Sequence, residues 1–550
     1  MDFMPHLVVV PVVLPLIAAA LLILLGEKRR RARVLVNIGA TLAGLLAALA
    51  ILWQVDSGGE PAAIGVYLAA NWEAPFGIVL VADRLSALML VLAGIVGLFA
   101  AVYAEAAWAR GGMYFHPLFQ LQLMGLNGAF LTGDLFNLFV FFEVMLAASY
   151  GLQLHGSGWP RVRSGLHYIA VNLLASSLFL IGLAVLYGVM GTLSMADIAA
   201  KLASVPGSDR GMLHAGAAIL AVAFLIKAAA WPLNAWLVPA YTAASAPVAA
   251  LFAVMTKVGV YILVRLWTLL FSDGPSMNFG SDVLLYAGLA TIAFGVLGLM
   301  ATLRPGRIAG YSILVSSGTL LAALGMGNAA VTSAALFYML SATMAVSVLF
   351  LFVELVGRIG KDGQPDLVGV DDEPSEDTNL DDEELPLVGQ AFPISLALLG
   401  LGFIAAGLLV AGLPPFSGFI AKVSLLQAVL AIQPGDKASD VASQSAAFWI
   451  VGLVLFAGLA TMVSLARTGI RHFWSTGGRL TSQVKIVEGA SVLGLLFACA
   501  LLTVFAEPVL RYTNAAAADL HAPQPYVNTV LATRPRPGPT RSVYVEEEAP

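Results

Sequence analysis

The sequence has little of the chemistry on which soluble enzymes and metalloproteins rely. It contains one cysteine, Cys499, which excludes an intramolecular disulfide framework and a thiolate metal cluster. Only 11% of its 550 residues are charged, and its seven histidines are scattered rather than paired. No glycine-rich loop that could cradle a phosphate is present. We therefore expect no metal, no cofactor and no nucleic-acid partner.

Apolar sequence fills the chain instead. Hydrophobic residues make up 59% of it, and its mean hydropathy is +0.89. Runs long enough to cross a bilayer recur from end to end, whereas the alternating segments typical of a membrane β-barrel do not occur. We predict an all-α polytopic membrane protein with about fourteen spans. These cover residues 6–25, 34–54, 84–106, 114–132, 135–154, 165–189, 212–232, 245–271, 283–302, 307–327, 330–356, 391–412 continuing brokenly to 433, 446–467 and 486–506.

The basic residues of the predicted loops lie mostly on one side of the membrane. If the N-terminus is outside, the odd-numbered loops hold 16 lysines and arginines and the even-numbered loops hold three. Cytoplasmic loops carry such an excess of positive charge, so we predict an external N-terminus. No lysine or arginine precedes the first apolar run, which favours a retained anchor over a cleaved signal peptide.

Two polar segments depart from this pattern. Residues 358–390 hold eleven aspartates and glutamates and almost no apolar residues, which predicts an acidic cytoplasmic loop that acts as a solvated linker. A cation-collecting antenna is the alternative. Residues 507–550, with a proline-rich stretch at 534–541, are expected to form an extended external tail.

Four charged residues stand out inside the apolar spans: Glu143, Lys227, Lys257 and Lys422. A charge at bilayer depth is costly, so it normally faces the interior of the bundle and marks an ion or proton path. Snorkelling to the interface is the simpler alternative, but it is difficult for the mid-span Lys257. Burial disfavours a charged lysine and a nearby carboxylate favours it. We predict that Glu143 pairs with Lys227 and that breaking this pair releases a proton.

Helix-breaking residues accompany two of these lysines. Pro232 follows Lys227 closely, and Pro414 and Pro415 precede Lys422. Proline lacks an N–H and displaces the carbonyl four residues back, and unwound backbone at membrane depth must be buried or line a wet cavity. Two broken helices with matched lysines are typical of transporters built from inverted repeats. Ordinary proline kinks are the alternative.

Five sequence blocks together resemble one family of membrane proteins. They are KAAAWPLNAWLVPAY from Lys227, SAPV from Ser245, KVGVY from Lys257, GYSILVSSG from Gly310 and GLPPFSGFIAK from Gly412. In this order they resemble the antiporter-like subunits shared by respiratory complex I and Mrp-type cation/proton antiporters. The resemblance extends over residues 80–430.

The resemblance implies fourteen helices, two inverted five-helix repeats and a proton path through Glu143, Lys227, Lys257 and Lys422. The breaks predicted at Pro232 and at Pro414 and Pro415 fall in the seventh and twelfth of these helices. The implied divisions are helices 1–3 at residues 1–113, a first repeat of helices 4–8 at 114–271, a second repeat of helices 9–13 at 272–469, helix 14 at 470–506 and the tail at 507–550.

Some positions depart from the family pattern. Tyr241 stands where complex I subunits typically have histidine, and the eleventh helix lacks their histidine and lysine. The resemblance therefore implies a central path through hydroxyl groups and water. The candidate hydroxyls are those of Tyr311, Ser312, Ser316, Tyr338 and Ser341.

The acidic loop and the block at residues 76–86 are most similar to the D-type chain of Mrp/Pha-type antiporters. This resemblance implies a subunit of a secondary transporter rather than an enzyme. The transporter would exchange protons for Na⁺ or K⁺ and serve pH homeostasis. Implied partners are the membrane subunits of A, B, C, E, F and G type in the inner membrane of a bacterium. A proton-pumping subunit of NADH-quinone oxidoreductase or of a membrane-bound hydrogenase, and an inert scaffold, are the alternatives.

Overall fold

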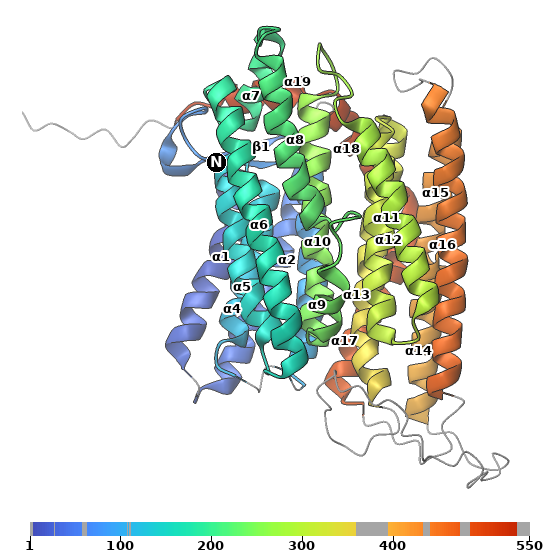
Figure 1. The fold of residues 1–550 in the computed structure, drawn as a ribbon. Helices are drawn as coiled ribbons and strands as arrows, with labels where there is room; N and C mark the ends of the chain where they lie inside the picture. Colours follow the sequence, from blue (N-terminus) through green and yellow to red (C-terminus); the bar gives the residue numbers. More distant parts are fainter. Residues whose placement is uncertain are drawn as a thin grey trace, which may run out of the picture.

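The structure of the protein is a computed structural model that describes residues 4–26, 28–57, 63–106, 108, 112–358, 394–432, 441–473 and 484–535. These residues form a bundle of long, nearly parallel helices with one small sheet at one end (Figure 1). The acidic loop predicted at 358–390 lies outside the described residues, apart from Arg358 itself.

The prediction of an all-α polytopic membrane protein is confirmed, and each predicted span coincides with one helix or with two consecutive helices. In the described part of the chain, 12 helices are long and apolar enough to cross a membrane. They are α1 (Met4–Leu25), α2 (Arg30–Ser57), α3 (Arg84–Ala104), α5 (Leu135–Leu154), α6 (Trp159–Met190), α8 (Arg210–Lys227), α10 (Ala246–Leu270), α11 (Ser281–Ala301), α12 (Pro305–Gly325), α13 (Ala329–Gly357), α16 (Val441–Phe473) and α17 (Ile486–Val504). Shorter elements are α4 (Phe115–Leu131), α7 (Met195–Lys201), η1 (Ala69–Asn71) and η3 (Leu202–Ser204).

The seventh predicted span is interrupted. Helix α8 ends at Lys227, and the next helix, α9 (Leu237–Ala243), begins after nine intervening residues. Ala229 has a φ of 55°, a left-handed conformation that ends the helix. Pro232 cannot donate to the helix, and the N–H of Trp231 is bound by the Thr291 hydroxyl of α11 at 2.8 Å.

The twelfth predicted span is interrupted as well. Helix α14 (Ile394–Ala411) ends before Gly412, Pro414 and Pro415, and α15 (Ser417–Leu430) follows them. Gly412 has a φ of 75°, which favours glycine. A Cβ at this position would also lie 2.5 Å from Cδ of Lys422, so glycine leaves the room that this side chain occupies.

Helix α10 occupies the centre of the molecule. Every one of its residues is buried, and it packs against α3, α8, α12 and α13. A helix that is apolar nearly all round is stable in such a position. Its charged residues, Lys257 and Arg265, must therefore find partners inside the protein.

The small sheet positions the start of α3. Strands β1 (Gly65–Leu68) and β2 (Val79–Ala82) pair antiparallel, with Gly65 opposite Ala82. The next residue, Asp83, is the N-cap of α3 and accepts from the Ser86 N–H at 2.9 Å. This cap fixes the Asp83 carboxylate at the end of the bundle where the small sheet lies (Figure 1).

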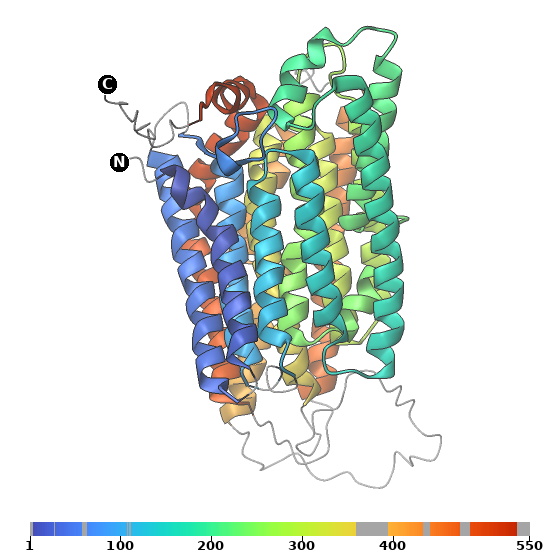
Figure 2. The ribbon, with the colours of Figure 1, turned by 90° about the vertical axis from the view of Figure 1, so that its left-hand side faces the viewer.

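The expectation of an extended tail after residue 507 is wrong for residues 507–532. They form α18 (Ala506–His521) and α19 (Gln524–Ala532), which lie across the end of the bundle (Figure 2). The reason is a four-residue period: Tyr512, Ala516 and Leu520 are buried on one face of α18, which packs mainly on α13. Because α18 is amphipathic and has few apolar residues, its sequence does not resemble that of a membrane-spanning helix.

Candidate functional site: a line of buried lysines

Lys257 lies at the centre of the bundle and is bound by two hydroxyl groups. Only 1% of its surface is exposed. Its Nζ donates to Oγ of Ser316 at 2.5 Å and to Oγ of Ser317 at 3.0 Å, both on α12. A serine hydroxyl can donate or accept, so these two groups can bind the lysine in its charged or its neutral form.

Lys227 is the last residue of α8 and reaches across to α6. Its Nζ donates to Oδ1 of Asn172 at 2.9 Å and lies 5.8 Å from the centre of the Phe142 ring. The backbone of this turn touches α10, because a Cβ at Gly259 would lie only 3.1 Å from the carbonyl carbon of Lys227. The end of α8 therefore packs against Gly259 of α10, which is two residues after Lys257 in the sequence.

The predicted ion pair between Glu143 and Lys227 is not formed in this structure. Glu143 lies half-buried on α5, and its Oε1 is buried without a hydrogen-bond partner. Its charge acts on Lys227 from a distance, and the Lys227 ammonium donates its hydrogen bond to the side-chain amide of Asn172 instead. Because the bound partner is a neutral amide, Lys227 has a hydrogen-bond acceptor without being held in an ion pair by a carboxylate.

Lys422 lies on α15 and turns back toward the break that precedes it. Its Nζ donates to the carbonyl oxygen of Ala411, the last residue of α14, at 2.5 Å. Two features hold this arrangement together: Gly412 leaves room for the side chain, and the hydroxyl groups of Ser341 and Ser417 bind each other at 2.9 Å between α13 and α15. Lys422 forms no ion pair with the residues that the structure describes.

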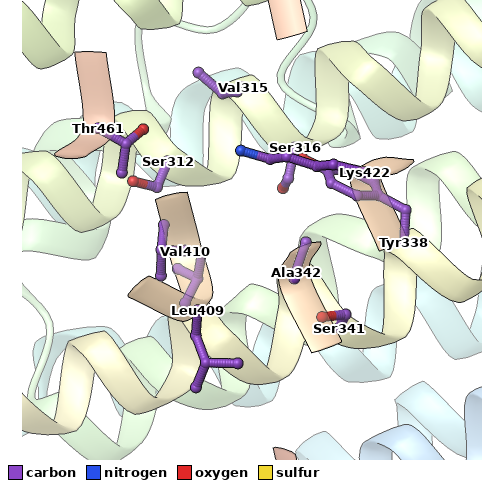
Figure 3. A pocket seen from close by; sticks show the side chains of 12 residues that line it. Ser312, Val315, Ser316, Tyr338, Ser341, Ala342, Leu409, Val410, Lys422 and Thr461 are labelled. Carbon is purple, nitrogen blue, oxygen red and sulfur yellow. The ribbon is translucent and has the colours of Figure 1, made fainter. Parts of the chain in front are cut away.

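A small cavity lies between Lys422 and α12, the helix whose serines bind Lys257 (Figure 3). Its polar lining is contributed by α12, α13, α15 and α16. The polar residues are Ser312, Ser316, Tyr338, Ser341, Lys422 and Thr461. Ser316 belongs both to this lining and to the partners of Lys257, so one hydroxyl group adjoins two lysine environments.

The tyrosines that the sequence singles out lie in three different places. Tyr338 lines the cavity. The Tyr241 hydroxyl bonds to Thr256 Oγ1 at 2.7 Å, beside Lys257 in sequence. The Tyr311 ring packs 6.4 Å from that of Phe294 on α11, away from the cavity lining.

The structure adds polar partners that the sequence analysis missed. They are Asn172 at Lys227, Ser317 at Lys257, and Thr461 in the cavity lining. Each is a small polar residue within an apolar span, which is the only signal that the sequence carries for it. A polar side chain in such a span normally has a partner, but the identity of that partner depends on helix packing.

A second buried charge on α10, Arg265, is held at the end of the bundle. It binds Asp83 through two hydrogen bonds of 2.5 and 2.6 Å, and it lies 5.3 Å from the centre of the Tyr526 ring of α19. Burial raises the pKa of the Asp83 carboxyl, but the charge of Arg265 and the hydrogen bonds from Arg265 and Ser86 outweigh it and hold the pKa below the usual 3.8. This closed pair differs from the three lysines, whose partners among the described residues are all neutral.

An all-helical membrane bundle with interrupted helices beside buried lysines has the architecture typical of secondary transporters. Comparison with known families gives a more specific assignment. The chain belongs to the family described as "NADH:quinone oxidoreductase/Mrp antiporter, TM", which matches residues 132–436.

Relatives match along nearly the whole chain. A relative from Rhizobium meliloti, named as the D chain of a probable K⁺/H⁺ antiporter, is 49% identical over 98% of this chain and 99% of its own. A relative from Alkalihalophilus pseudofirmus, named as the D chain of a Na⁺/H⁺ antiporter, is 34% identical over 96% of this chain and 100% of its own.

Solved structures share the fold. A chain of the Mrp complex from Dietzia sp. DQ12-45-1b has a TM-score of 0.79 at 26% identity, over 96% of this chain and 100% of that one. A chain of respiratory complex I from Thermus thermophilus has a TM-score of 0.72 at 20% identity, over 96% of this chain and 100% of that one.

Proposed function

We propose that this chain is the D-type component of a multisubunit K⁺ or Na⁺/H⁺ antiporter of a bacterial inner membrane, and that it moves protons through Glu143, Lys227, Lys257 and Lys422. The high identity to antiporter components, against 20% to the complex I chain, favours exchange over quinone-linked pumping. The remaining components, of A, B, C, E, F and G type, complete the complex. The external N-terminus and the two inverted repeats belong to this proposal.

The proton path begins at Glu143. Its unpartnered carboxylate oxygen can accept a proton, and its charge then no longer stabilises the ammonium of Lys227. Within the described residues Lys227 donates to Asn172 and forms no ion pair, so losing that stabilisation favours release of its proton. The next lysine, Lys257, lies on the helix that touches the end of α8.

The step from Lys257 to Lys422 runs through hydroxyl groups. The observation that carries the proposal is that Ser316 binds Lys257 and lines the cavity of Lys422. A hydroxyl that accepts a proton on one side and donates one on the other transfers charge without itself ionising. Tyr338 and Ser341 line the same cavity and extend this hydroxyl route; Tyr241 belongs to it through Thr256, beside Lys257.

The interrupted helices allow the lysines to change partners. The Ala411 carbonyl accepts from Lys422 because α14 ends there, so its oxygen is not used within a helix. A backbone carbonyl accepts hydrogen bonds but takes no proton, so it stabilises charged Lys422 until the cavity side offers an acceptor. Pro232, Pro414 and Pro415 keep both breaks unwound.

The test is reconstitution of the complete complex in proteoliposomes with a pH-sensitive dye inside. Addition of K⁺ or Na⁺ should move protons in the opposite direction, and Lys257→Ala should abolish this movement by removing the centre of the path. Cation-driven proton movement at the wild-type rate in the Lys257→Ala complex would refute the proposed path. The cation that drives the faster movement identifies the substrate.

A further inference from the structure

A second polar cavity lies in the N-terminal helices, apart from the lysines. It lies between α1, α2, α3 and α4 and is small. Most of its wall is apolar, but three polar side chains, those of Thr41, Gln120 and Asn127, line it together with Pro11 and Pro15. The proposed proton path uses none of these residues.

Gln120 of α4 presents an unused oxygen. The side chain is fully buried, and its Nε2 donates to the backbone oxygen and Oδ1 of Asn37, at 3.1 and 2.8 Å, and to Oγ1 of Thr41 at 2.9 Å. The backbone oxygen of Asn37, which can only accept, fixes the orientation of the amide, because a flipped amide would place its oxygen against this oxygen. The Gln120 Oε1 is consequently buried without any hydrogen-bond partner.

The prolines of α1 supply a second acceptor. Pro15 has no N–H, so the carbonyl of Pro11 four residues earlier loses its helical partner. The amide nitrogen of Asn127 donates to this carbonyl at 2.8 Å, which turns the Asn127 nitrogen toward α1. The Pro11 oxygen keeps its second lone pair for another ligand.

Thr41 completes the set. Its hydroxyl donates to the backbone oxygen of Asn37 at 2.8 Å and accepts from Gln120, so its hydrogen is already used. The lining therefore offers neutral oxygen atoms, from a hydroxyl, side-chain amides and a proline carbonyl, while the N–H and O–H groups of Gln120 and Thr41 face one another or Asn37.

We propose that this cavity binds one monovalent alkali cation. Neutral carbonyl and hydroxyl oxygens replace the hydration shell of such an ion. An anion would need donors, and a divalent cation is normally held by carboxylates, which are absent from this lining. The inference rests on the proposed antiporter function and deepens it, because it gives the exchanged cation a site in the chain that carries the protons.

The charged groups nearest along these helices make the site a weak one. Arg33 lies two helical turns before Thr41 on α2, and its guanidinium is bound by the Met113 carbonyl. His116 lies one turn before Gln120 and contacts Glu105 at 3.4 Å. With positive charge on that side and no carboxylate in the lining, binding is reversible, as transport requires.

The first test adds a methyl group to a residue that lines the cavity. A Cβ at Gly44, which lines the cavity, meets no atom within 4 Å, so Gly44→Ala adds a methyl group to open space. Gly39→Ala on the same helix meets nothing either, and Gly39 does not line the cavity. Radioactive rubidium, standing in for K⁺, and sodium serve as probes for equilibrium binding to the purified complete complex.

Gly44→Ala should weaken rubidium binding about tenfold and sodium binding less, because the larger ion loses its space first, whereas Gly39→Ala should match wild type. The second pair removes oxygen. Gln120→Leu should abolish one equivalent of bound cation, whereas Gln122→Leu, equally buried on α4 but outside the lining, should not.

Unchanged binding in both Gly44→Ala and Gln120→Leu, or no saturable cation binding by the wild-type complex, would overturn the inference. Because binding is measured without turnover, these results are independent of the Lys257→Ala test of the proton path. Either conclusion can therefore fail while the other stands.

Discussion

The hydroxyl of Ser316 lies 2.5 Å from Nζ of Lys257 and lines the cavity into which Lys422 projects. This one side chain therefore adjoins both Lys257 of α10 and the cavity that Lys422 of α15 lines. The twelve-residue cavity lining contains no other lysine and no carboxylate, so the proposed path passes between the two lysines through hydroxyl groups and water.

Ser316→Ala should therefore slow cation-driven proton movement about tenfold without preventing assembly, because Ser317 still holds Lys257 at 3.0 Å but does not line the cavity. Ser177→Ala, an exposed serine of α6, is the matched control and should match wild type. Initial rates of internal pH change in proteoliposomes decide this. A Ser316→Ala complex as fast as the control would exclude the hydroxyl route.

Glu143→Ala should abolish exchange while the complex still assembles, because the carboxylate controls Lys227 from a distance and holds no helix in place. Glu143→Asp keeps the charge and should retain part of the rate. Blue-native gels establish assembly, and the same pH-dye assay gives the rate. If the alanine variant exchanges normally, uptake of protons does not begin at Glu143.

Gly458→Ala should impair transport by crowding Lys422. A Cβ there would lie 3.2 Å from Nζ of Lys422 and 3.0 Å from the Ala411 oxygen, so the hydrogen bond between them is pushed out of place. Gly452→Ala on the same helix meets nothing within 4 Å and is the control. We expect a several-fold lower rate only for Gly458→Ala; equal rates would show that the position of Lys422 against Ala411 is unimportant.

Arg265→Met should be strongly destabilising, by about 3–5 kcal/mol, because it leaves the buried Asp83 carboxylate without a partner. The double variant Asp83→Asn with Arg265→Met should recover most of that loss. Thermal unfolding of the purified complex measures both. A single variant as stable as the double would contradict this interpretation.

The pH dependence of that pair has a definite sign. The folded pKa of Asp83 lies below its usual 3.8, so the ion pair contributes fully above that value and its contribution is lost as the pH falls through the folded pKa. The stability difference between wild type and the double variant should stay constant from about pH 8 to about pH 5.

Much of the fold follows from the sequence because the bilayer requires long apolar helices. The same requirement makes Lys227, Lys257 and Lys422 conspicuous, and the prolines beside two of them indicate where α8 and α14 end. Their partners were not predictable. Asn172 takes the place next to Lys227 that we expected Glu143 to occupy, because helix packing and not composition decides which side chain arrives.

Helix α18 and the cavity lined by Gln120 and Thr41 were also not predicted, because both depend on how the helices pack. Helix α18 buries only one face, so its apolar residues are too few to stand out beside true spans. Gln120 and Thr41 are uncharged, so the sequence gives no sign that their polar groups lie together. Their proximity depends on the packing of α4 against α1 and α2.

The most direct test of the proton path is the response of Lys422 to arginine. Arginine keeps the positive charge but cannot release its proton, whereas a relay must release one in every cycle. Cation-driven proton movement should therefore be lost in both Lys422→Arg and Lys422→Ala complexes that assemble normally. An active Lys422→Arg complex beside an inactive Lys422→Ala complex would show that Lys422 is a fixed structural cation, and the relay would be contradicted.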